Sequence, residues 1–275
     1  MDICEPEIKK DDILLLNDPH FNPGNICVIT GAGAGIGRAT ALAAAANNLT
    51  VVGLDIDEKA GRETAEMALE MEGNMLFLKT DLTQDEEVEH AVTEAAKLGT
   101  VKYLANIAGI QHIDAVENFP MEKYDLMQRL MLRAPFLLSK LVFPHMRKSS
   151  DGTGAIGNMT SVHAHICTIN KPVYNITKFG LRALTQSLAA EGDGKIRAFS
   201  VSTGFVKTGL ALKQIPAQAE QRGITQEEVV RDVMMGSSRV REMMAPVEVG
   251  NPVVESVVES LPGVASTWLG QLHLF

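Results

Sequence analysis

A glycine-rich turn directly after a short apolar run is the feature that most restricts how this chain can fold. The run ICVIT at residues 26–30 leads into GAGAGIG at 31–37, and an alanine-rich stretch then extends to Asn47. Glycine permits a tight turn and a close approach of the backbone to a ligand. A helix behind such a turn presents unpaired N–H groups and a positive dipole end, which suit a pyrophosphate. The pattern predicts a strand, a phosphate-binding turn and a helix, although Gly-Ala repeats also serve plain packing of a helix on a strand.

Short apolar runs and helical segments alternate along the rest of the chain. Further strands are predicted at residues 50–56, 75–80, 101–109, 154–161 and 195–202. Helices are predicted at 57–72 and from Pro172 to Gly192. A third is predicted to begin at a capping box formed by Thr83 and Glu86. A fourth is predicted along 120–148, with bends or ends at Pro135 and Pro144. Runs that are apolar on both faces are typical of a parallel sheet covered by helices on both sides. The sequence therefore predicts an α/β fold with a single-domain, doubly wound parallel sheet.

Two segments lie outside this alternation. Residues 1–20 are polar and are predicted to form an N-terminal arm, which leaves 21–275 as the folded domain. Residues 208–244 have a helical pattern and are rich in Met, Gln and charged residues. Insertions at the carboxyl edge of a parallel sheet lie beside its ligand site, so this segment is predicted to be a lid.

The composition excludes several classes of protein. Of 275 residues, 45% are hydrophobic and 21% charged, which is typical of a globular protein. The 34 acidic and 25 basic residues give a net charge of −9, which argues against nucleic acid as a partner. Three cysteines (Cys4, Cys27 and Cys167) without CxxC spacing favour a reducing compartment. With a charged N-terminal segment and no apolar stretch of membrane-spanning length, we expect a cytoplasmic protein without a membrane partner.

An acidic residue follows the second apolar run. Asp55 ends TVVGLD, and a carboxylate at this place accepts hydrogen bonds from the adenosine ribose hydroxyls of a dinucleotide and repels a 2′-phosphate. The glycine turn contains no Lys or Arg, and neither does the sequence next to Asp55. The predicted cofactor is therefore NAD rather than NADP. Taken alone, Asp55 could also be a solvated acid at a strand end.

Three residues further along form a candidate catalytic set. Tyr174 and Lys178 are four apart in a helical segment and share one face. An ammonium beside a phenol stabilises the phenolate and lowers its pKa from about 10, which predicts that Tyr174 acts as a general base while hydride leaves the substrate. Ser161 can hydrogen-bond to the same substrate oxygen. Without the glycine turn and the serine, a Tyr/Lys pair is more often just a helix face.

Together these motifs resemble those of the short-chain dehydrogenase/reductase family. TGAGAGIG at 30–37 is similar to its cofactor turn, Asn106-Ile-Ala-Gly109 to its NNAG motif, and Tyr174-Asn-Ile-Thr-Lys178 to its YxxxK signature. The resemblance covers almost the whole chain and implies a Rossmann-like, NAD-binding catalytic domain in which Lys178 also binds the nicotinamide ribose. The cofactor-binding residues that it implies are Gly31, Gly35, Ile36, Gly37, Asp55, Asp81, Leu82, Asn106, Ala108, Gly109, Tyr174, Lys178, Val206 and Thr208.

The chain departs from the family pattern at three positions. Met131 stands where the family has an asparagine that completes a catalytic tetrad. A thioether cannot hold a proton-relay water as an amide does, so the relay is expected to differ or to be slower. Ile107 replaces the second asparagine of NNAG, and Thr203 replaces a proline.

One branch of the family, the bacterial 3-hydroxybutyrate dehydrogenases, is the most similar. Segments shared with it are GIQH at 109–112, Ser161-Val-His163, Lys171 and residues 212–232. The resemblance implies a substrate carboxylate held by Gln111, His163, Lys171 and Gln214. A small anionic hydroxy or keto acid needs a cation and neutral donors aimed at one carboxylate. The expected reaction interconverts (R)-3-hydroxybutyrate and acetoacetate, and the family analogy implies a homotetramer.

Other interpretations remain open on the sequence. The substrate could be another small ketone, a polyol or an oxoacyl compound, and Met131 and Ile107 leave room for a catalytically weak NAD-binding regulator. His163, His165 and Cys167 alternate, but no fourth ligand follows, so no metal is expected. A Ser/His hydrolase lacks the G-x-S-x-G turn.

Overall fold

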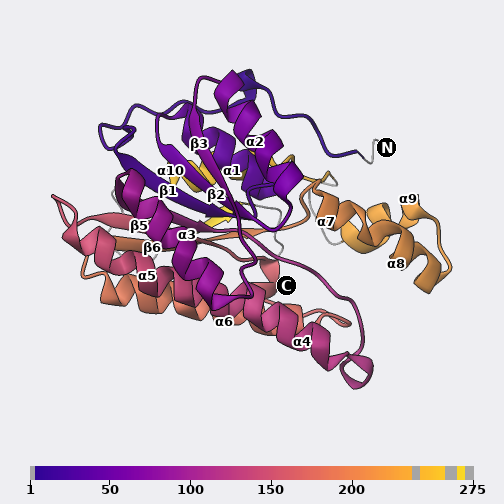
Figure 1. Ribbon diagram of the computed structural model, residues 1–275. Helices are drawn as coiled ribbons and strands as arrows, with labels where there is room; N and C mark the ends of the chain where they lie inside the picture. Colours follow the sequence, from indigo (N-terminus) through magenta and orange to yellow (C-terminus); the bar gives the residue numbers. More distant parts are fainter. Residues whose placement is uncertain (1–3, 237–241, 258–264, 270–275) are drawn as a thin grey trace.

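Seven parallel strands form one sheet at the centre of the molecule (Figure 1). The computed structural model describes residues 4–236, 242–257 and 265–269. The strand order is β3-β2-β1-β4-β5-β6-β7. The strands are β1 (Asn25–Thr30), β2 (Thr50–Asp55), β3 (Asn74–Lys79), β4 (Thr100–Asn106), β5 (Gly154–Met159), β6 (Ile196–Thr203) and β7 (Ala265–Leu269). The order reverses between β1 and β4, which is where a doubly wound sheet opens its ligand crevice.

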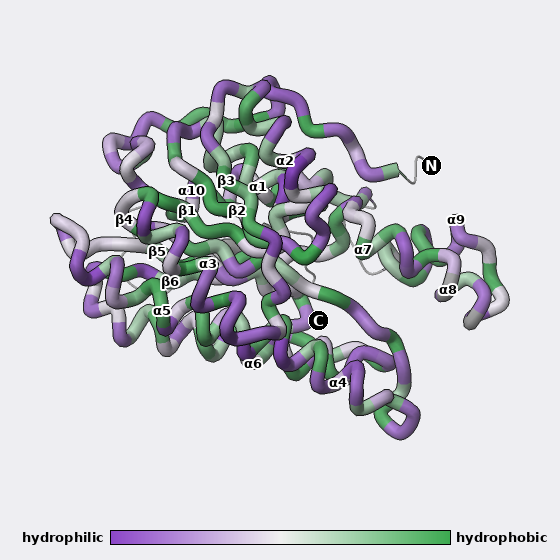
Figure 2. Tube along the Cα trace, viewed as in Figure 1, coloured by the Kyte–Doolittle hydropathy of each residue, from purple (hydrophilic) through white to green (hydrophobic). Residues whose placement is uncertain are grey.

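Helices cover both faces of the sheet. They are α1 (Gly35–Ala46), α2 (Glu58–Glu70), α3 (Asp85–Leu98), α5 (Ala134–Lys148), α6 (Pro172–Glu191) and α10 (Val247–Glu255), while α4 (Met121–Gln128) packs against α6. Cys27 and Ile29 of β1 pack in one core cluster with α1 and α10, whereas Ile26 and Val28 pack in another with α3 and α5. Figure 2 shows the same division as apolar strands inside and polar outer helix faces. The predicted α/β fold with a doubly wound parallel sheet is confirmed.

The turn after β1 can be built only with glycine. Gly31 has a φ of +70° and Gly35 one of +54°, a region that favours glycine. A Cβ on Gly37 would lie 1.9 Å from the carbonyl oxygen of Gly31. The turn therefore brings the start of α1 against the end of β1 and places the first N–H groups of that helix at the carboxyl edge of the sheet.

The predicted capping box at Thr83 and Glu86 is wrong. The following helix α3 begins at Asp85, two residues later, with Gln84 as its N-cap. The hydroxyl of Thr83 instead donates to Oδ1 of Asp81 at 2.7 Å, and so does its backbone N–H at 2.9 Å. A local turn around the aspartate thus takes the threonine that the helix would have used.

The helical segment predicted at 120–148 is interrupted before its prolines by a wide helical turn. Residues Arg129–Arg133 form a π-helical turn (η3) between α4 and α5, and such turns often mark functional sites. Met131 lies inside it and is 1% exposed. Pro135 begins α5, and Pro144 lies within that helix without ending it.

The N-terminal arm lies against the main body. Ile8 and Ile13 are buried in the cluster that contains α1 and α10. The side chain of Asn251 in α10 accepts from the N–H of Leu14 at 3.1 Å and donates to the carbonyl of Asp12 at 2.8 Å. The arm is therefore anchored on the α1 and α10 face rather than extended into solvent.

Residues after β6 form a small helical lobe, orange in Figure 1, that projects from the sheet. It contains α7 (Gly209–Leu212), α8 (Gln214–Arg222), α9 (Gln226–Glu228) and the π-helical turn η5 (Val229–Met234). This lobe has its own apolar cluster, which includes Ile215, Val229 and Met234. The segment predicted as a lid, 208–244, includes residues 237–241, which lie outside the described residues.

Candidate active site

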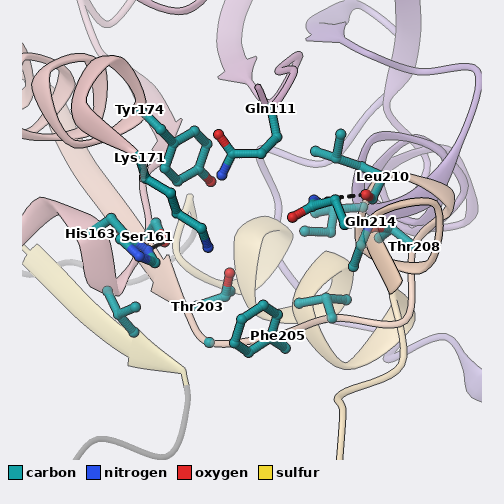
Figure 3. A pocket seen from close by; sticks show the side chains of 15 residues that line it. Gln111, Ser161, His163, Lys171, Tyr174, Thr203, Phe205, Thr208, Leu210 and Gln214 are labelled. Atoms are coloured by element: carbon teal, nitrogen blue, oxygen red, sulfur yellow. Dashed lines mark hydrogen bonds between the residues drawn. The ribbon is translucent and has the colours of Figure 1, made fainter. Parts of the chain in front are cut away.

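The predicted catalytic residues meet at the carboxyl edge of the sheet (Figure 3). Ser161 follows β5, and it is buried at the start of a short 3₁₀ turn, η4 (Val162–Ala164). Tyr174 and Lys178 lie on the first turns of α6. One pocket is lined by Ser161 and Tyr174 together with Gln111, Lys171 and Gln214, which come from the loops after β4 and β5 and from the helical lobe.

Tyr174 is half-buried, and its pKa departs from the expected direction. Burial raises the pKa of the phenol, and the hydrogen bond with Ser161 lowers it only in part. The ammonium of Lys178 lies 5.4 Å from the centre of the phenol ring and donates to the carbonyl of Met159 at 2.8 Å. Burial also lowers the pKa of Lys178 to about 8. The predicted lowering of the Tyr174 pKa by Lys178 is therefore wrong for this arrangement, because the ammonium faces a carbonyl rather than the phenol oxygen.

His163 is buried, with both ring nitrogens in use. Its Nδ1 lies 3.2 Å from Oγ of Ser161, and its Nε2 lies 2.9 Å from Oγ1 of Thr168. The ring meets that of Tyr174 edge to face, with ring centres 5.6 Å apart. Burial, followed by the charges of Lys171 and Lys178, lowers the pKa of His163 to about 4. A neutral imidazole thus connects the serine to the threonine.

Lys171 provides the positive charge of the pocket. Its ammonium lies 5.5 Å from the ring centre of Phe205, and burial followed by the charge of Arg222 lowers its pKa. The pocket encloses about 110 Å³, which suits a small molecule. Figure 3 shows Lys171 and Gln111 directed toward its centre, with Gln214 on the opposite wall. Within the described residues, Oε1 of Gln111 and Oε1 of Gln214 are buried without a hydrogen-bond partner, so each amide can still accept a hydrogen bond from a ligand. The NH2 group of Gln214 donates to the carbonyl of Leu210 at 2.8 Å and would have to leave it to bind an anion.

A second cavity, of about 410 Å³, lies over the β1, β2 and β4 ends. Its lining includes the predicted cofactor residues Gly31, Asp55, Asp81, Leu82, Ala108 and Gly109. Oδ2 of Asp55 accepts from the N–H of Gly33 at 2.8 Å, and Oδ1 accepts from the N–H of Asp57 at 3.0 Å, so the carboxylate is held at the mouth of the turn. Lys79 pairs with Asp55 in the register of β2 and β3. The sheet register thus places a lysine across from Asp55, although the sequence has none next to it.

The amide groups expected to hold a pyrophosphate already hold an anion of this chain. Oε1 of Glu5 accepts from the N–H of Gly35 at 3.0 Å, and Oε2 accepts from the N–H of Gly209 at 2.9 Å. Gly35 begins α1 and Gly209 begins α7, directly after Thr208. The carboxylate is a stand-in for a phosphate, which shows that this turn accepts negative charge and fits a dinucleotide.

The remaining cofactor positions border these two cavities. Ile36, Val206 and Thr208 line the pocket that holds Tyr174. Asn106 is buried at the end of β4, where its amide donates to Oδ1 of Asn158 at 2.8 Å. Thr30 was not singled out from the sequence, yet its hydroxyl accepts from the N–H groups of Ile107 and Ala108 and so ties the end of β1 to that of β4.

The alternating residues His163, His165 and Cys167 do not converge. Nε2 of His165 lies 3.0 Å from Oγ of Ser202, whereas His163 faces Ser161, and Cys167 is exposed. Within the described part of the chain, no group of three His, Cys, Asp or Glu side chains is arranged to hold a metal ion. The helices described there include none that is both long and apolar enough to span a bilayer.

Comparisons with known proteins agree with this geometry. The family model "short chain dehydrogenase" matches residues 25–219. D-beta-hydroxybutyrate dehydrogenase of Rhizobium meliloti is 32% identical over 82% of this chain and 88% of its own length. The 3-oxoacyl-acyl-carrier-protein reductase of Thermotoga maritima is 28% identical over 74% of this chain and 82% of its own length. The crystal structure of an actinorhodin polyketide ketoreductase with NADPH matches with a TM-score of 0.83 at 21% identity, over 90% of this chain and 96% of that one.

The chain therefore belongs to the short-chain dehydrogenase family. It is an oxidoreductase whose fold and turn are those of a family that binds NAD or NADP.

Proposed function

We propose that this enzyme interconverts (R)-3-hydroxybutyrate and acetoacetate, with NAD as the cofactor. The observation that carries the proposal is the placement of Lys171 with the side-chain amides of Gln111 and Gln214 in the pocket that holds Tyr174. A cation with neutral donors suits one carboxylate, and the small cavity suits a substrate of a few carbon atoms. The R. meliloti relative carries the name of this activity.

The roles of the side chains follow from their positions. When bound, the nicotinamide accepts a hydride from the alcohol carbon or returns one to the ketone. Tyr174 takes the hydroxyl proton in oxidation and gives it back in reduction, and Ser161 holds the reacting oxygen. Lys171, Gln111 and Gln214 hold the carboxylate and so fix the distance between the charged end and the reacting carbon. His163 is the fourth residue expected to bind the carboxylate, and its ring nitrogens lie 3.2 Å from Oγ of Ser161 and 2.9 Å from Oγ1 of Thr168 before any substrate is bound.

The preference for NAD rests on Asp55. Its carboxylate is fixed by the N–H groups of Gly33 and Asp57, so it cannot turn away from a ribose without losing two hydrogen bonds. A 2′-phosphate there would meet a negative charge. We expect Asp55→Asn to bring the kcat/KM values for NAD and NADP closer together.

The first test is NADH formation from (R)-3-hydroxybutyrate, with the S enantiomer and NADP as parallel reactions. Fast, R-selective turnover with NAD is the expected result. No turnover of either enantiomer, with NADH still bound, would refute the substrate assignment and favour another ketone or a non-catalytic NAD-binding role.

The second test concerns the carboxylate site. Lys171→Ala should raise KM for acetoacetate at least about tenfold, because a charge-assisted hydrogen bond contributes about 1.5–3 kcal/mol. Reduction of neutral ketones should be unchanged, and so should both activities in the control Lys97→Ala on α3. Equal losses for acidic and neutral substrates would count against a carboxylate site.

We also propose a homotetramer in the cytoplasm. The free thiols Cys27 and Cys167 fit a reducing compartment. On α5 and α6, Phe136, Ile176 and Phe179 are 58%, 49% and 40% exposed, which suits burial against a second copy. Light scattering should give four times the chain mass, and a monomer would refute this part of the proposal.

A further inference from the structure

Asn170 has a backbone conformation that residues with side chains rarely adopt, and it lies in the loop that leads to Lys171. Its φ is +61°, within the left-handed region. Asn48, Glu72 and Asp193 share this conformation, but each of them lies just after the last turn of a helix, where left-handed residues are common. Asn170 instead lies before a helix, since α6 begins two residues later. The turn at Asn170 therefore has a cause other than the end of a helix.

The turn leads the chain into Lys171 and then into α6. Pro172 is the first residue of that helix and its ring fixes its own φ, so the change of chain direction falls on the residues before it. Ile169, on the other side of Asn170, is 79% exposed and gives the loop no anchor in the core. Lys171 is nevertheless directed toward the centre of the pocket (Figure 3). Its direction thus depends on the backbone of the residue before it.

A backbone hydrogen bond ties this turn to the loop that carries Gln111. The carbonyl of Asn170 accepts from the N–H of Asp114 at 3.0 Å. Asp114 lies three residues after Gln111 in the loop that follows β4, and its own carboxylate accepts from the N–H of Ala115 at 2.8 Å. A short stretch of backbone on each side of this bond therefore connects two members of the carboxylate site, Gln111 and Lys171.

We propose that Asn170 is a positioning residue that sets the distance between the charged end of the substrate and its reacting carbon. Its left-handed turn keeps its carbonyl on the N–H of Asp114 and so directs Lys171 toward the same point as Gln111. This inference rests on the proposed function, because it takes the bound group to be a carboxylate. With that carboxylate held at one place, a 3-oxo acid brings its carbonyl to Tyr174, whereas an acid with one more methylene places it too far along. The turn thus selects substrates by their length.

Substitutions at Asn170 test the turn and leave the side chains of the carboxylate site in place. Glycine adopts the left-handed region freely, whereas a β-branched side chain is an outlier there. Asn170→Gly should therefore keep the turn, and Asn170→Val should break it. Asp193→Val is a matched control, because Asp193 is exposed, has a φ of +52° and lies at the far end of α6. Both valine variants lose stability for the same reason, but only Asn170→Val moves Lys171.

Selectivity between two keto acids measures the effect. Acetoacetate and levulinate (4-oxopentanoate) carry the same groups and differ by one methylene between carboxylate and ketone. We expect Asn170→Val to raise KM for acetoacetate at least about tenfold, to lower kcat less than about threefold, and to reduce the preference for acetoacetate over levulinate at least about tenfold. Asn170→Gly and Asp193→Val should keep the wild-type KM and preference. An equal loss for both acids in Asn170→Val would mean a purely structural role and would overturn the proposal.

A double-variant cycle shows whether Asn170 acts through Lys171. Lys171→Ala removes the ammonium that the turn directs. In that background Asn170→Val should raise KM for acetoacetate no further, because the effects of two coupled positions are not additive. Additive effects would mean that Asn170 acts on the pocket by another path, and they would overturn the assignment.

A measurement without substrate separates this inference from the proposed function. Amide hydrogen exchange, followed by NMR in the protein alone, reports how well the N–H of Asp114 is protected. We expect exchange at Asp114 to be at least about tenfold faster in Asn170→Val than in the wild type, and unchanged in Asn170→Gly and Asp193→Val. If the wild type turns over neither keto acid, the proposed function fails on its own. An unchanged exchange rate at Asp114 in Asn170→Val would overturn the link between the two loops, whatever the substrate is.

Discussion

Tyr174 keeps its proton because its phenol is buried beside apolar side chains. Burial raises its pKa, and the hydrogen bond with Ser161 offsets only part of the rise. A neutral phenol can donate to a ketone directly, whereas alcohol oxidation needs the phenolate, whose population below the pKa grows about tenfold per pH unit. We expect oxidation of 3-hydroxybutyrate to speed up continuously between about pH 7 and pH 9, while reduction of acetoacetate stays flat over the same range.

Profiles of kcat against pH in both directions measure this difference. Tyr174→Phe should abolish both reactions and leave NADH binding nearly intact. An oxidation profile that levels off below about pH 8 would mean a lowered phenol pKa, as the spacing of Tyr174 and Lys178 had suggested.

The sequence predicted which residues meet at this site but not how their charges act. Four-residue spacing places Lys178 on the same helix face as Tyr174, and the structure agrees. The direction of the ammonium depends on the carbonyl of Met159, which reaches it from β5. Likewise, no motif predicts the contact between His163 and Thr168, which only the folded loop after β5 creates.

Met131 lies where a polar side chain would be costly. It is 1% exposed in the π-helical turn, beside Gly109 and near Tyr174. Met131→Asn should lower the free energy of unfolding by about 2–4 kcal/mol, because it buries an unpaired amide and leaves a cavity. Met131→Leu conserves volume and should cost less than about 1.5 kcal/mol. Urea unfolding compares the two variants, and equal stabilities would show that the site accommodates a polar group.

At the scale of elements, the alternation of strands and helices was predictable because each strand is apolar on both faces. Ile26 and Ile29 of β1 are fully buried on opposite sides of the sheet. Helix ends were less predictable, since Thr83 bonds to Asp81 instead of capping α3. The pairing of Lys79 with Asp55 depends on strand order, and one sequence does not encode that visibly.

An ion pair fastens β4 to the loop that precedes β5. Lys102 of β4 is 5% exposed and pairs with Asp151, whose side chain is 35% exposed. Partial burial by itself would raise the pKa of Asp151, but hydrogen bonds from Lys102, Thr153 and Ser149 outweigh it and lower the pKa. Asp151→Asn should lower the free energy of unfolding by about 1–3 kcal/mol, because it leaves the buried ammonium of Lys102 without its partner. Lys102→Met should cost less, since Asp151 can turn to water.

The pH dependence of this pair follows from the lowered pKa of Asp151. The contribution of the ion pair to the free energy of unfolding is fully present above the ordinary aspartate pKa of about 4. It is lost as the pH falls through the lower pKa that Asp151 has in the folded state. Urea unfolding at about pH 7 and pH 3 measures the free energy of unfolding of wild type and Asp151→Asn. The difference between the two proteins should be smaller at the lower pH. A difference that grows on acidification would contradict the assignment.

At the scale of the whole molecule, segments far apart in the chain share one anion site. The arm supplies Glu5, the turn after β1 supplies Gly35, and the segment after β6 supplies Gly209. Figure 1 shows the N-terminal arm ending close to α7. Because the two amides suit a pyrophosphate, the carboxylate and the cofactor compete for the same donors.

Removing this carboxylate should therefore strengthen cofactor binding. Charged hydrogen bonds at an exposed site contribute about 1 kcal/mol, so Glu5→Ala should lower the Kd for NADH about fivefold, as measured by NADH fluorescence without substrate. Glu7→Ala removes an exposed carboxylate two residues along the same arm and should leave the Kd unchanged. Added salt weakens both the internal contact and the bound pyrophosphate, so the comparison is made at fixed ionic strength. Equal Kd values for wild type and Glu5→Ala would show that the arm leaves the turn freely and does not set the affinity for the cofactor.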